Sequence, residues 1–162
     1  MSALILLAAA LAPPLPEPQR AIALAVAAPG RPHCTATAPD GTSGPCLPVF
    51  TLSSGGGVNA RTLGDSIRIT RGAARKLSPQ EFALLAAHEV AHSWLGHDRS
   101  THANELAADR LGAELACRAG FDPLAGLSLY RHLRSGKTHP PGEQRRATIA
   151  AVPCPRSGLP RR

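Results

Sequence analysis

The pentapeptide His-Glu-Val-Ala-His at residues 88–92 constrains the fold most, because its chemistry requires a helix around it. The flanking residues predict such a helix. Ser78 suits the N-cap, Pro79 suits the first helical position, and Glu81 completes an S-x-x-E capping box. Gly96 is typical of the residue that ends a helix. We therefore expect the pentapeptide to lie well inside a helix that runs from Ser78 to Gly96.

This helix would place His88 and His92 on one face, since residues four apart are neighbours on a helix surface. Two imidazoles at this spacing can bind one metal ion. Glu89, which follows the first histidine, can then act as general base toward a water on the metal. The same five letters also occur in helices whose histidines are solvated or cap an end. The rest of the chain has to decide between the two interpretations.

A second helix is predicted from about Thr101 to Arg118, after a short turn. The short connection favours antiparallel packing at about 8–10 Å between helix axes, and the small Gly112 allows close approach. Glu105 then returns to the level of the histidines as a candidate third ligand. Asp109, one turn further, can accept the free ring N–H of a ligating histidine. The alternative is that Glu105 and Asp109 form a solvated acidic face.

At this point HEVAH, followed by ELAAD at 105–109, resembles the HExxH and ExxxD pair of the M48 zinc peptidases, which are gluzincins. Segments at 58–78, 119–123 and 138–149 extend the resemblance over about residues 57–150. It implies an α+β fold with a thermolysin-like core, in which a small β-sheet lies beside a hairpin of active-site helices and the C-terminal half is mainly helical. The connection between the two motifs is much shorter than in many members, where it carries an extra segment.

The resemblance implies that His88, His92 and Glu105 bind one zinc ion and that Glu89 is the catalytic base. It also implies that Asp109 contacts a ligand residue without binding the ion itself. The implied activity is that of a zinc metalloendopeptidase. A protein or peptide substrate would bind in extended form on an edge strand beside the active-site helix. The alternative function is that of a zinc-binding but non-proteolytic relative with a chaperone-like or regulatory role.

His139 and Arg145 match the H-P-x-x-x-x-R element of the family. The resemblance places both at the cleft. His139 has two candidate functional roles there: it could donate to the oxyanion of the tetrahedral intermediate, or it could occupy the open position of the metal until substrate arrives. The alternative is a solvated loop histidine.

Two strands are predicted around a turn at Gly64-Asp65, at 58–60 and at 66–70. After the second catalytic helix, Asp122-Pro123 is expected to begin a third helix that continues to about residue 134. Tyr130 and His132 are expected at the surface or at the rim of the cleft. The turn histidines, His97 and His102, could line the rim of the cleft, but a solvated position is favoured.

Four cysteines allow three pairings. Proximity in the sequence favours disulfides Cys34–Cys46 and Cys117–Cys154. No C-x-x-C spacing supports the alternative of a cysteine-ligated metal. The other alternative is four free thiols in a cytosolic protein.

The ends of the chain differ from its centre. An apolar run followed by prolines suggests a signal segment and linker at 1–28, although no Lys or Arg precedes the run. A single domain is expected at 29–154 and a disordered tail at 155–162. We therefore expect export to the periplasm or the extracellular space, with no integral membrane span. The net charge of +7 leaves peripheral membrane contact open. The arginines are scattered along the chain rather than clustered, which argues against nucleic-acid binding.

Overall fold

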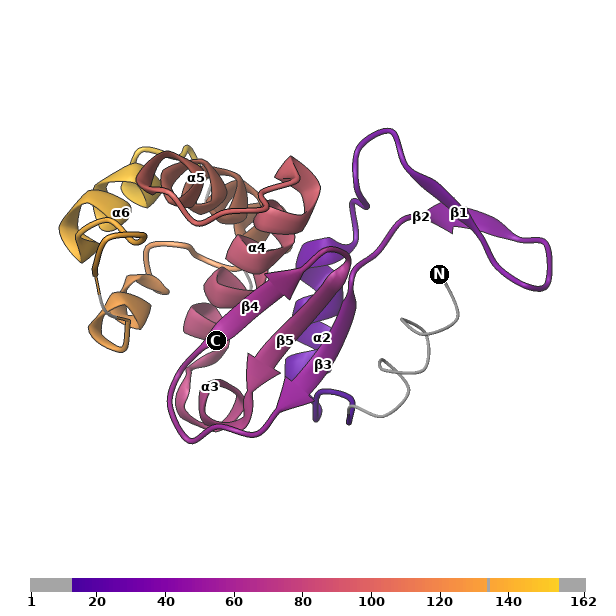
Figure 1. Cartoon of the computed structure of the whole chain (residues 1–162), viewed down its shortest axis with the longest axis horizontal. Coiled ribbons are helices and arrows are strands. Elements are labelled where there is room, and N and C mark those ends of the chain that lie inside the picture. The colour runs from indigo at the N-terminus through magenta and orange to yellow at the C-terminus, as the bar shows by residue number, and fades with distance from the viewer. Residues whose placement is uncertain (1–12, 134, 155–162) are drawn as a thin grey trace.

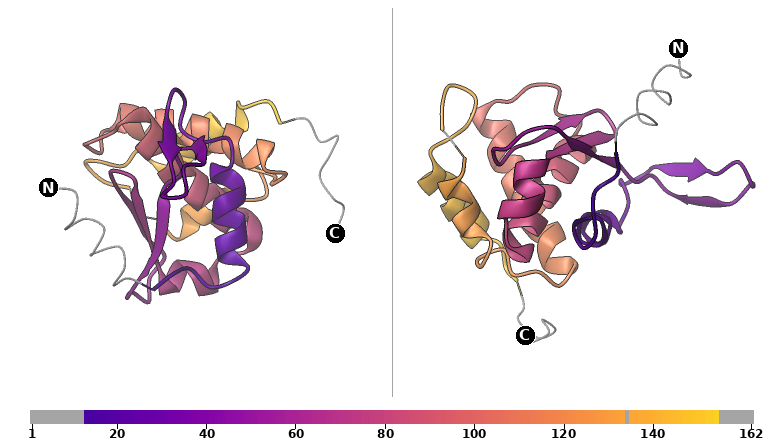
Figure 2. Two further views of the ribbon diagram at one scale, coloured as in Figure 1. Left: turned by 90° about the vertical axis from the view of Figure 1, so that its right-hand side faces the viewer. Right: turned by 90° about the horizontal axis from the view of Figure 1, so that it is seen from below.

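A three-stranded sheet forms one layer of the molecule, and helices cover one of its faces (Figures 1 and 2). The structure, a computed structural model, describes residues 13–133 and 135–154. The sheet order is β3-β5-β4, with β3 (Val49–Ser53) parallel and β4 (Ala60–Leu63) antiparallel to the central β5 (Ser66–Thr70). The architecture is α+β, as the sequence predicted.

The strands follow the expected alternation. In β5, Ile67 and Ile69 are fully buried against the helices, and Arg68 between them is exposed. The predicted strand at 66–70 is confirmed, together with its turn at residues 64–65. The predicted strand at 58–60 lies too early in the chain, because β4 begins at Ala60. The parallel strand β3 was not predicted.

The helix that contains the pentapeptide, α4 (Pro79–Leu95), has the predicted ends. The hydroxyl of Ser78 accepts a hydrogen bond from the main-chain N–H of Glu81, whose carboxylate accepts one from the N–H of Ser78. Gly96 ends the helix with a φ of 66°, a left-handed conformation that glycine adopts without strain. The helix is buried on nearly all sides, which is why apolar and small residues surround the pentapeptide.

The helix that carries Glu105, α5 (His102–Arg118), packs antiparallel to α4, as predicted. The hydroxyl of Thr101 caps its start by accepting from the N–H of Asn104. Gly112 lies against the main chain of His88: a Cβ at this position would come within 2.9 Å of the His88 nitrogen. The absence of a side chain here therefore sets how closely the two helices approach.

Helix α2 (Gln19–Ala27) was not predicted as part of the domain, since residues 1–28 were expected to be a signal segment and linker. It packs against α4, and it buries Ile22, Ala23, Val26 and Ala27 in the common core. At least residues 19–27 are therefore a structural part of the domain. The apolar run at 3–12 and the tail at 155–162 lie outside the described residues.

The predicted third helix from 122 to 134 is wrong. This stretch forms turns and one short 3₁₀ helix, η1 (Leu127–Arg131). Gly126 is packed so tightly on α4 that a Cβ would lie 2.8 Å from the carbonyl oxygen of Gln80. Close packing on α4, and the bond from the Ser128 hydroxyl to Glu81, override the helical pattern.

The chain ends its described part with α6 (Gly142–Ala150), which packs on α5 and η1. A disulfide between Cys117 and Cys154 joins the end of α5 to the segment after α6. A second disulfide, Cys34–Cys46, closes the hairpin of β1 (Thr35–Thr37) and β2 (Ser43–Pro45), which projects from the body (Figure 1). Both predicted pairings are confirmed.

Two disulfides are typical of proteins that fold in an oxidising environment. Within the part of the chain that the structure covers, none of the helices combines the length and the apolar character needed to cross a membrane. Short α3 (Arg71–Lys76) connects β5 to α4 and completes the set of elements.

Candidate metal centre

Three candidate ligands from α4 and α5 converge on one point. The Nε2 atoms of His88 and His92 lie 3.0 Å apart, and the carboxylate oxygens of Glu105 lie 3.5 Å and 3.4 Å from them. All the ligand atoms lie within 4.8 Å of one another. In a tetrahedral site with ligand bonds of about 2.0–2.1 Å, ligand atoms are about 3.3 Å apart. This cluster could therefore bind a metal ion.

The chemistry of the cluster also fits a cation. Glu105 is 2% exposed, and its Oε2 is a buried atom without a hydrogen-bond partner among the described residues. The Nε2 atoms of His88 and His92 face each other at 3.0 Å, so in the absence of a cation one ring must donate a proton to the other. A cation between the three groups satisfies all of these atoms at once. The residues present fit a metal ion.

Asp109 supports the cluster in the predicted way. Its Oδ1 lies 3.0 Å from Nδ1 of His88, so it can accept the ring proton and leave Nε2 free to bind a metal. Arg145 forms a two-pronged contact with Asp109, at 2.8 Å from Nε and 2.7 Å from the terminal nitrogen. Asp109 and Arg145 are both buried, and their charges compensate each other.

These contacts shift the pKa values of the buried groups. Burial lowers the pKa of His88, but the neighbouring carboxylates of Asp109 and Glu105 outweigh it and raise this pKa from 6.5 to about 9. Burial raises the pKa of Asp109, but Arg145 and His88 outweigh burial and hold it below its ordinary value. Burial also raises the pKa of Glu105, but His88 and His92 outweigh burial and hold this pKa well below its usual range. The carboxylates of Glu105 and Asp109 are therefore both ionised at neutral pH.

Tyr130 was expected at the surface or the rim, and this expectation is wrong for its side chain. It is buried, and its hydroxyl donates to Oδ1 of Asp109 at 2.8 Å. The guanidinium carbon of Arg145 lies 4.8 Å from its ring centre. Asp109 thus has three partners, Arg145, Tyr130 and His88. No spacing in the sequence pointed to Tyr130, because its contact depends on how η1 packs.

His97 was expected to be a solvated turn residue, but its Nδ1 lies 3.0 Å from Nδ1 of His92. It is partly buried, and burial followed by the nearby His92 lowers its pKa. A neutral His97 can accept the Nδ1–H of His92, which leaves the Nε2 of His92 directed at the cluster. The left-handed turn at Gly96 returns His97 to the histidine face, and this glycine was the available sequence signal.

The two loops at the mouth of the site are tied together. Ser100 donates to Oε1 of Glu105 at 2.6 Å and lies 3.3 Å from the carbonyl oxygen of Thr138. His102, also expected to be solvated, is exposed, and its Nε2 lies 3.2 Å from the carbonyl oxygen of Gly136. The loop that carries His139 is therefore anchored to the start of α5.

His139 lies beside the cluster without joining it. Its Nε2 is 3.8 Å from Oε2 of Glu105, and its side chain is 47% exposed. Its Nδ1 lies 2.9 Å from the hydroxyl of Thr138. The predicted neighbourhood of His139, Arg145 and the ligands is therefore present in the structure.

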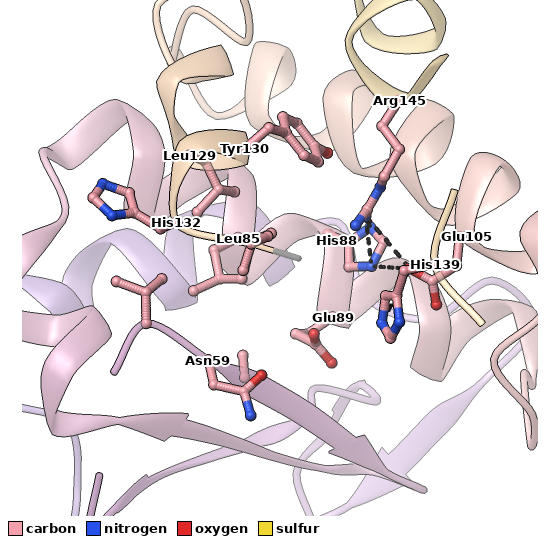
Figure 3. A pocket seen from close by; sticks show the side chains of 13 residues that line it. Asn59, Leu85, His88, Glu89, Glu105, Leu129, Tyr130, His132, His139 and Arg145 are labelled. Atoms are coloured by element: carbon pink, nitrogen blue, oxygen red, sulfur yellow. Dashed lines mark hydrogen bonds and ion pairs between the residues drawn. The ribbon is translucent and has the colours of Figure 1, made fainter. Parts of the chain in front are cut away.

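Glu89, with His88 and Glu105 of the cluster, borders two adjoining cavities of about 320 and 360 Å³, and Figure 3 shows the smaller one. Both cavities are lined by His88, Glu89, Glu105 and His139, and by Asn59 and Ala60 beside the cluster. The larger is polar and includes His92 and His97. The smaller extends along the apolar side chains of Leu85 on α4, Leu129 on η1 and Leu133 just after η1, to the exposed His132 at its rim.

The edge strand β4 forms the opposite wall. Thr62 on this strand lies 2.6 Å from Oε2 of Glu89 and 2.8 Å from its carbonyl oxygen. Because β5 is paired on both sides, β4 is the strand beside the cavities that has a free edge in the described part of the sheet. Sequence reasoning missed Thr62, because the predicted strand ended at residue 60.

No protein-family model matches this chain, and no curated protein matches it.

Proposed function

We propose that this protein is a zinc-dependent endopeptidase of the M48 type with a thermolysin-like catalytic core. The observation that carries the proposal is the position of Glu89. Its carboxylate lies on the same helix as the two histidines and borders both cavities, next to a cluster suited to one metal ion. A site that only stored a metal would not need a buried carboxylate at the cavity wall.

The donor set favours zinc. Two imidazoles and one carboxylate are the ligands of one class of catalytic zinc site, which keeps a further position open. His88, His92 and Glu105 would hold the ion. When bound, zinc supplies a Lewis acid that polarises the scissile carbonyl and makes a water molecule acidic.

Glu89 would move the proton in this reaction. It takes a proton from the attacking water as the water oxygen bonds to the carbonyl carbon, and it gives that proton to the leaving nitrogen as the C–N bond breaks. Arg145 and Tyr130 hold Asp109, and Asp109 holds His88. Their role is to keep the ligand ring in place.

The substrate would be an unfolded or extended peptide. A strand with a free edge can pair with an extended chain through main-chain hydrogen bonds. The part of β4 beside Glu89 offers such an edge, and residues 58–62 line the cavities. Alternate side chains of the substrate would then point toward the apolar wall formed by Leu85 and Leu129.

We propose that the protein acts outside the cytosol, in the periplasm or in the extracellular space. Its two disulfides support this location, since cytosolic thiols are kept reduced.

Digestion of a fluorescently labelled, unfolded protein by the purified chain tests the activity. We expect cleavage that a zinc chelator abolishes and added Zn²⁺ restores. Glu89→Gln should lower turnover by about 10²–10⁴-fold, the usual contribution of a general base, while zinc content and thermal midpoint stay the same. Near wild-type turnover in Glu89→Gln would rule out this mechanism.

Metal analysis tests the ligand set separately. We expect about one zinc per chain, because the cluster has room for a single three-ligand site. Glu105→Ala should lose the ion, with Glu143→Ala on the surface of α6 as the control. Unchanged zinc content in Glu105→Ala would remove Glu105 from the ligand set. Zinc binding without any hydrolysis would instead favour the non-proteolytic alternative.

A further inference from the structure

The hydroxyl of Thr62 forms a contact with Glu89 that neither residue's local sequence explains. Thr62 lies opposite Ile67 in the register of β4 and β5, and Ile67 is fully buried against the helices. Cross-strand partners share a face of the sheet, so the side chain of Thr62 points toward α4. There it meets Oε2 of Glu89 at 2.6 Å, across 27 positions of sequence.

The contact is chemically asymmetric. A threonine hydroxyl has a single proton to donate, and here it lies near two acceptors of the same residue, Oε2 of Glu89 at 2.6 Å and the Glu89 carbonyl oxygen at 2.8 Å. The bond to the ionised carboxylate is the stronger one. Among the described residues, Thr62 supplies the one hydrogen bond that the structure shows on the carboxylate of Glu89.

This contact leaves the two carboxylate oxygens of Glu89 with different surroundings. Thr62 on the strand holds Oε2, whereas Oε1 has no hydrogen-bond partner among the described residues, on a side chain that borders both cavities. Without the hydroxyl, the terminal torsion of a glutamate is broad and can rotate either oxygen outward. Thr62 therefore selects one orientation of the carboxylate.

We propose that Thr62 is a positioning residue for Glu89, which holds Oε2 so that Oε1 is the oxygen that exchanges protons with the substrate water and the leaving nitrogen. The proposal rests on the peptidase function proposed above. The carbonyl oxygen of Glu89 offers the Thr62 proton a second acceptor while the carboxyl carries the transferred proton. Thr62 thus keeps an acceptor on Glu89 in both halves of the reaction.

The kinetic test compares Thr62→Val with Thr62→Ser. Valine keeps the shape but removes the donor, so kcat should fall about 10- to 100-fold, as expected for the loss of a hydrogen bond to a charged group, with KM within about twofold. Serine restores the donor and should bring kcat back to within about threefold of wild type. Thr37→Val, an exposed threonine of the β1–β2 hairpin, is the matched control.

A second test needs neither metal nor activity. Unfolding of the chelator-treated chain is measured for Thr62→Val, Glu89→Ala and the double variant. If the two side chains interact, the change in the unfolding equilibrium constant of the double variant should differ about tenfold from the product of the changes in the two single variants. If the effects of the two substitutions on stability are independent, Thr62 and Glu89 do not interact and the proposal is overturned.

The outcomes separate the two proposals. A wild-type chain without chelator-sensitive cleavage overturns the proposed function, and the catalytic role of Thr62 with it. A wild-type chain that cleaves, together with a Thr62→Val variant that matches its kcat, overturns only the role of Thr62. A loss that Thr62→Ser does not recover would show that threonine acts through packing and would also overturn it.

Discussion

The role of His139 depends on how close its ring lies to the metal cluster. Its Nε2 lies 3.8 Å from Glu105, and the Thr138 hydroxyl lies 2.9 Å from its other ring nitrogen. A ring held in this way beside the cluster is placed to donate to an oxyanion. We predict that His139→Ala lowers turnover by about 10²–10³-fold and retains zinc, the usual effect of losing one such donor.

Three outcomes of this experiment are informative. Greater activity in His139→Ala would contradict the donor role and indicate that the ring blocks the open metal position. Unchanged turnover, substrate binding and zinc affinity would leave a solvated loop histidine. The exposed His33, which lines neither cavity, provides the control, since His33→Ala should retain zinc and turnover.

The pH dependence of stability follows from His88. Its pKa in the metal-free fold is raised from 6.5 to about 9. A raised pKa means that the folded state holds the proton more tightly than the unfolded chain. The stabilisation is therefore fully present below about pH 6.5 and is lost as the pH rises through about 9, by about 1–3 kcal/mol.

Urea denaturation of the chelator-treated protein from pH 6 to pH 10 measures this loss. His88→Gln should lack it, because glutamine does not titrate. Zinc should reverse the trend, since metal binding requires the neutral imidazole and is weakened by protons. A flat stability profile for the metal-free wild type would contradict the prediction.

At the scale of elements, the distance between α4 and α5 decides the geometry of the cluster. A Cβ on Gly112 would lie 2.9 Å and 3.0 Å from the main-chain nitrogen and Cα of His88, atoms that cannot move aside. Alanine gains about 1 kcal/mol of helix propensity, but overpacking of this kind costs about 1–3 kcal/mol. We predict that Gly112→Ala destabilises the fold and weakens zinc binding at least tenfold.

Competition against a zinc indicator, together with thermal unfolding, checks this. Gly44→Ala is the control, because a Cβ there meets open space. Zinc affinity that stays at the wild-type value in Gly112→Ala would show that Glu105 does not depend on close helix packing.

At the scale of the whole molecule, the two disulfides have unequal roles. Cys117–Cys154 ties the end of α5 to the segment after α6, and the chain between them carries His139 and Arg145. Cys34–Cys46 closes an exposed hairpin outside the core. We predict that replacing the Cys117–Cys154 pair with serines costs about 2–4 kcal/mol and lowers activity.

Replacing the Cys34–Cys46 pair should have a smaller effect and leave zinc binding intact, because the hairpin contributes little to the buried core. Thermal unfolding and zinc titration of both variants make the comparison. Equal losses, or zinc loss in the hairpin variant alone, would contradict it.

The sequence alone was sufficient for the features that depend on near neighbours. The ends of α4 follow from Ser78, Glu81 and Gly96, and the spacing of the histidines follows from the helix that these residues bound. The short turn before α5 was enough to return Glu105 to the histidines. Both disulfides were predictable because each joins the cysteines that are nearest in sequence.

Tertiary structure alone decided the contacts between distant segments. Tyr130 reaches Asp109 across 21 positions, and Thr62 reaches Glu89 across 27, so no local pattern can indicate either contact. The stretch after α5 carries a helical pattern, yet packing of Gly126 on α4 keeps it in turns. Helix α2 falls in the stretch that was expected to be a signal segment and linker, yet its apolar face packs into the core. Caps and spacings act within about five residues, whereas these contacts exist only after the elements have packed.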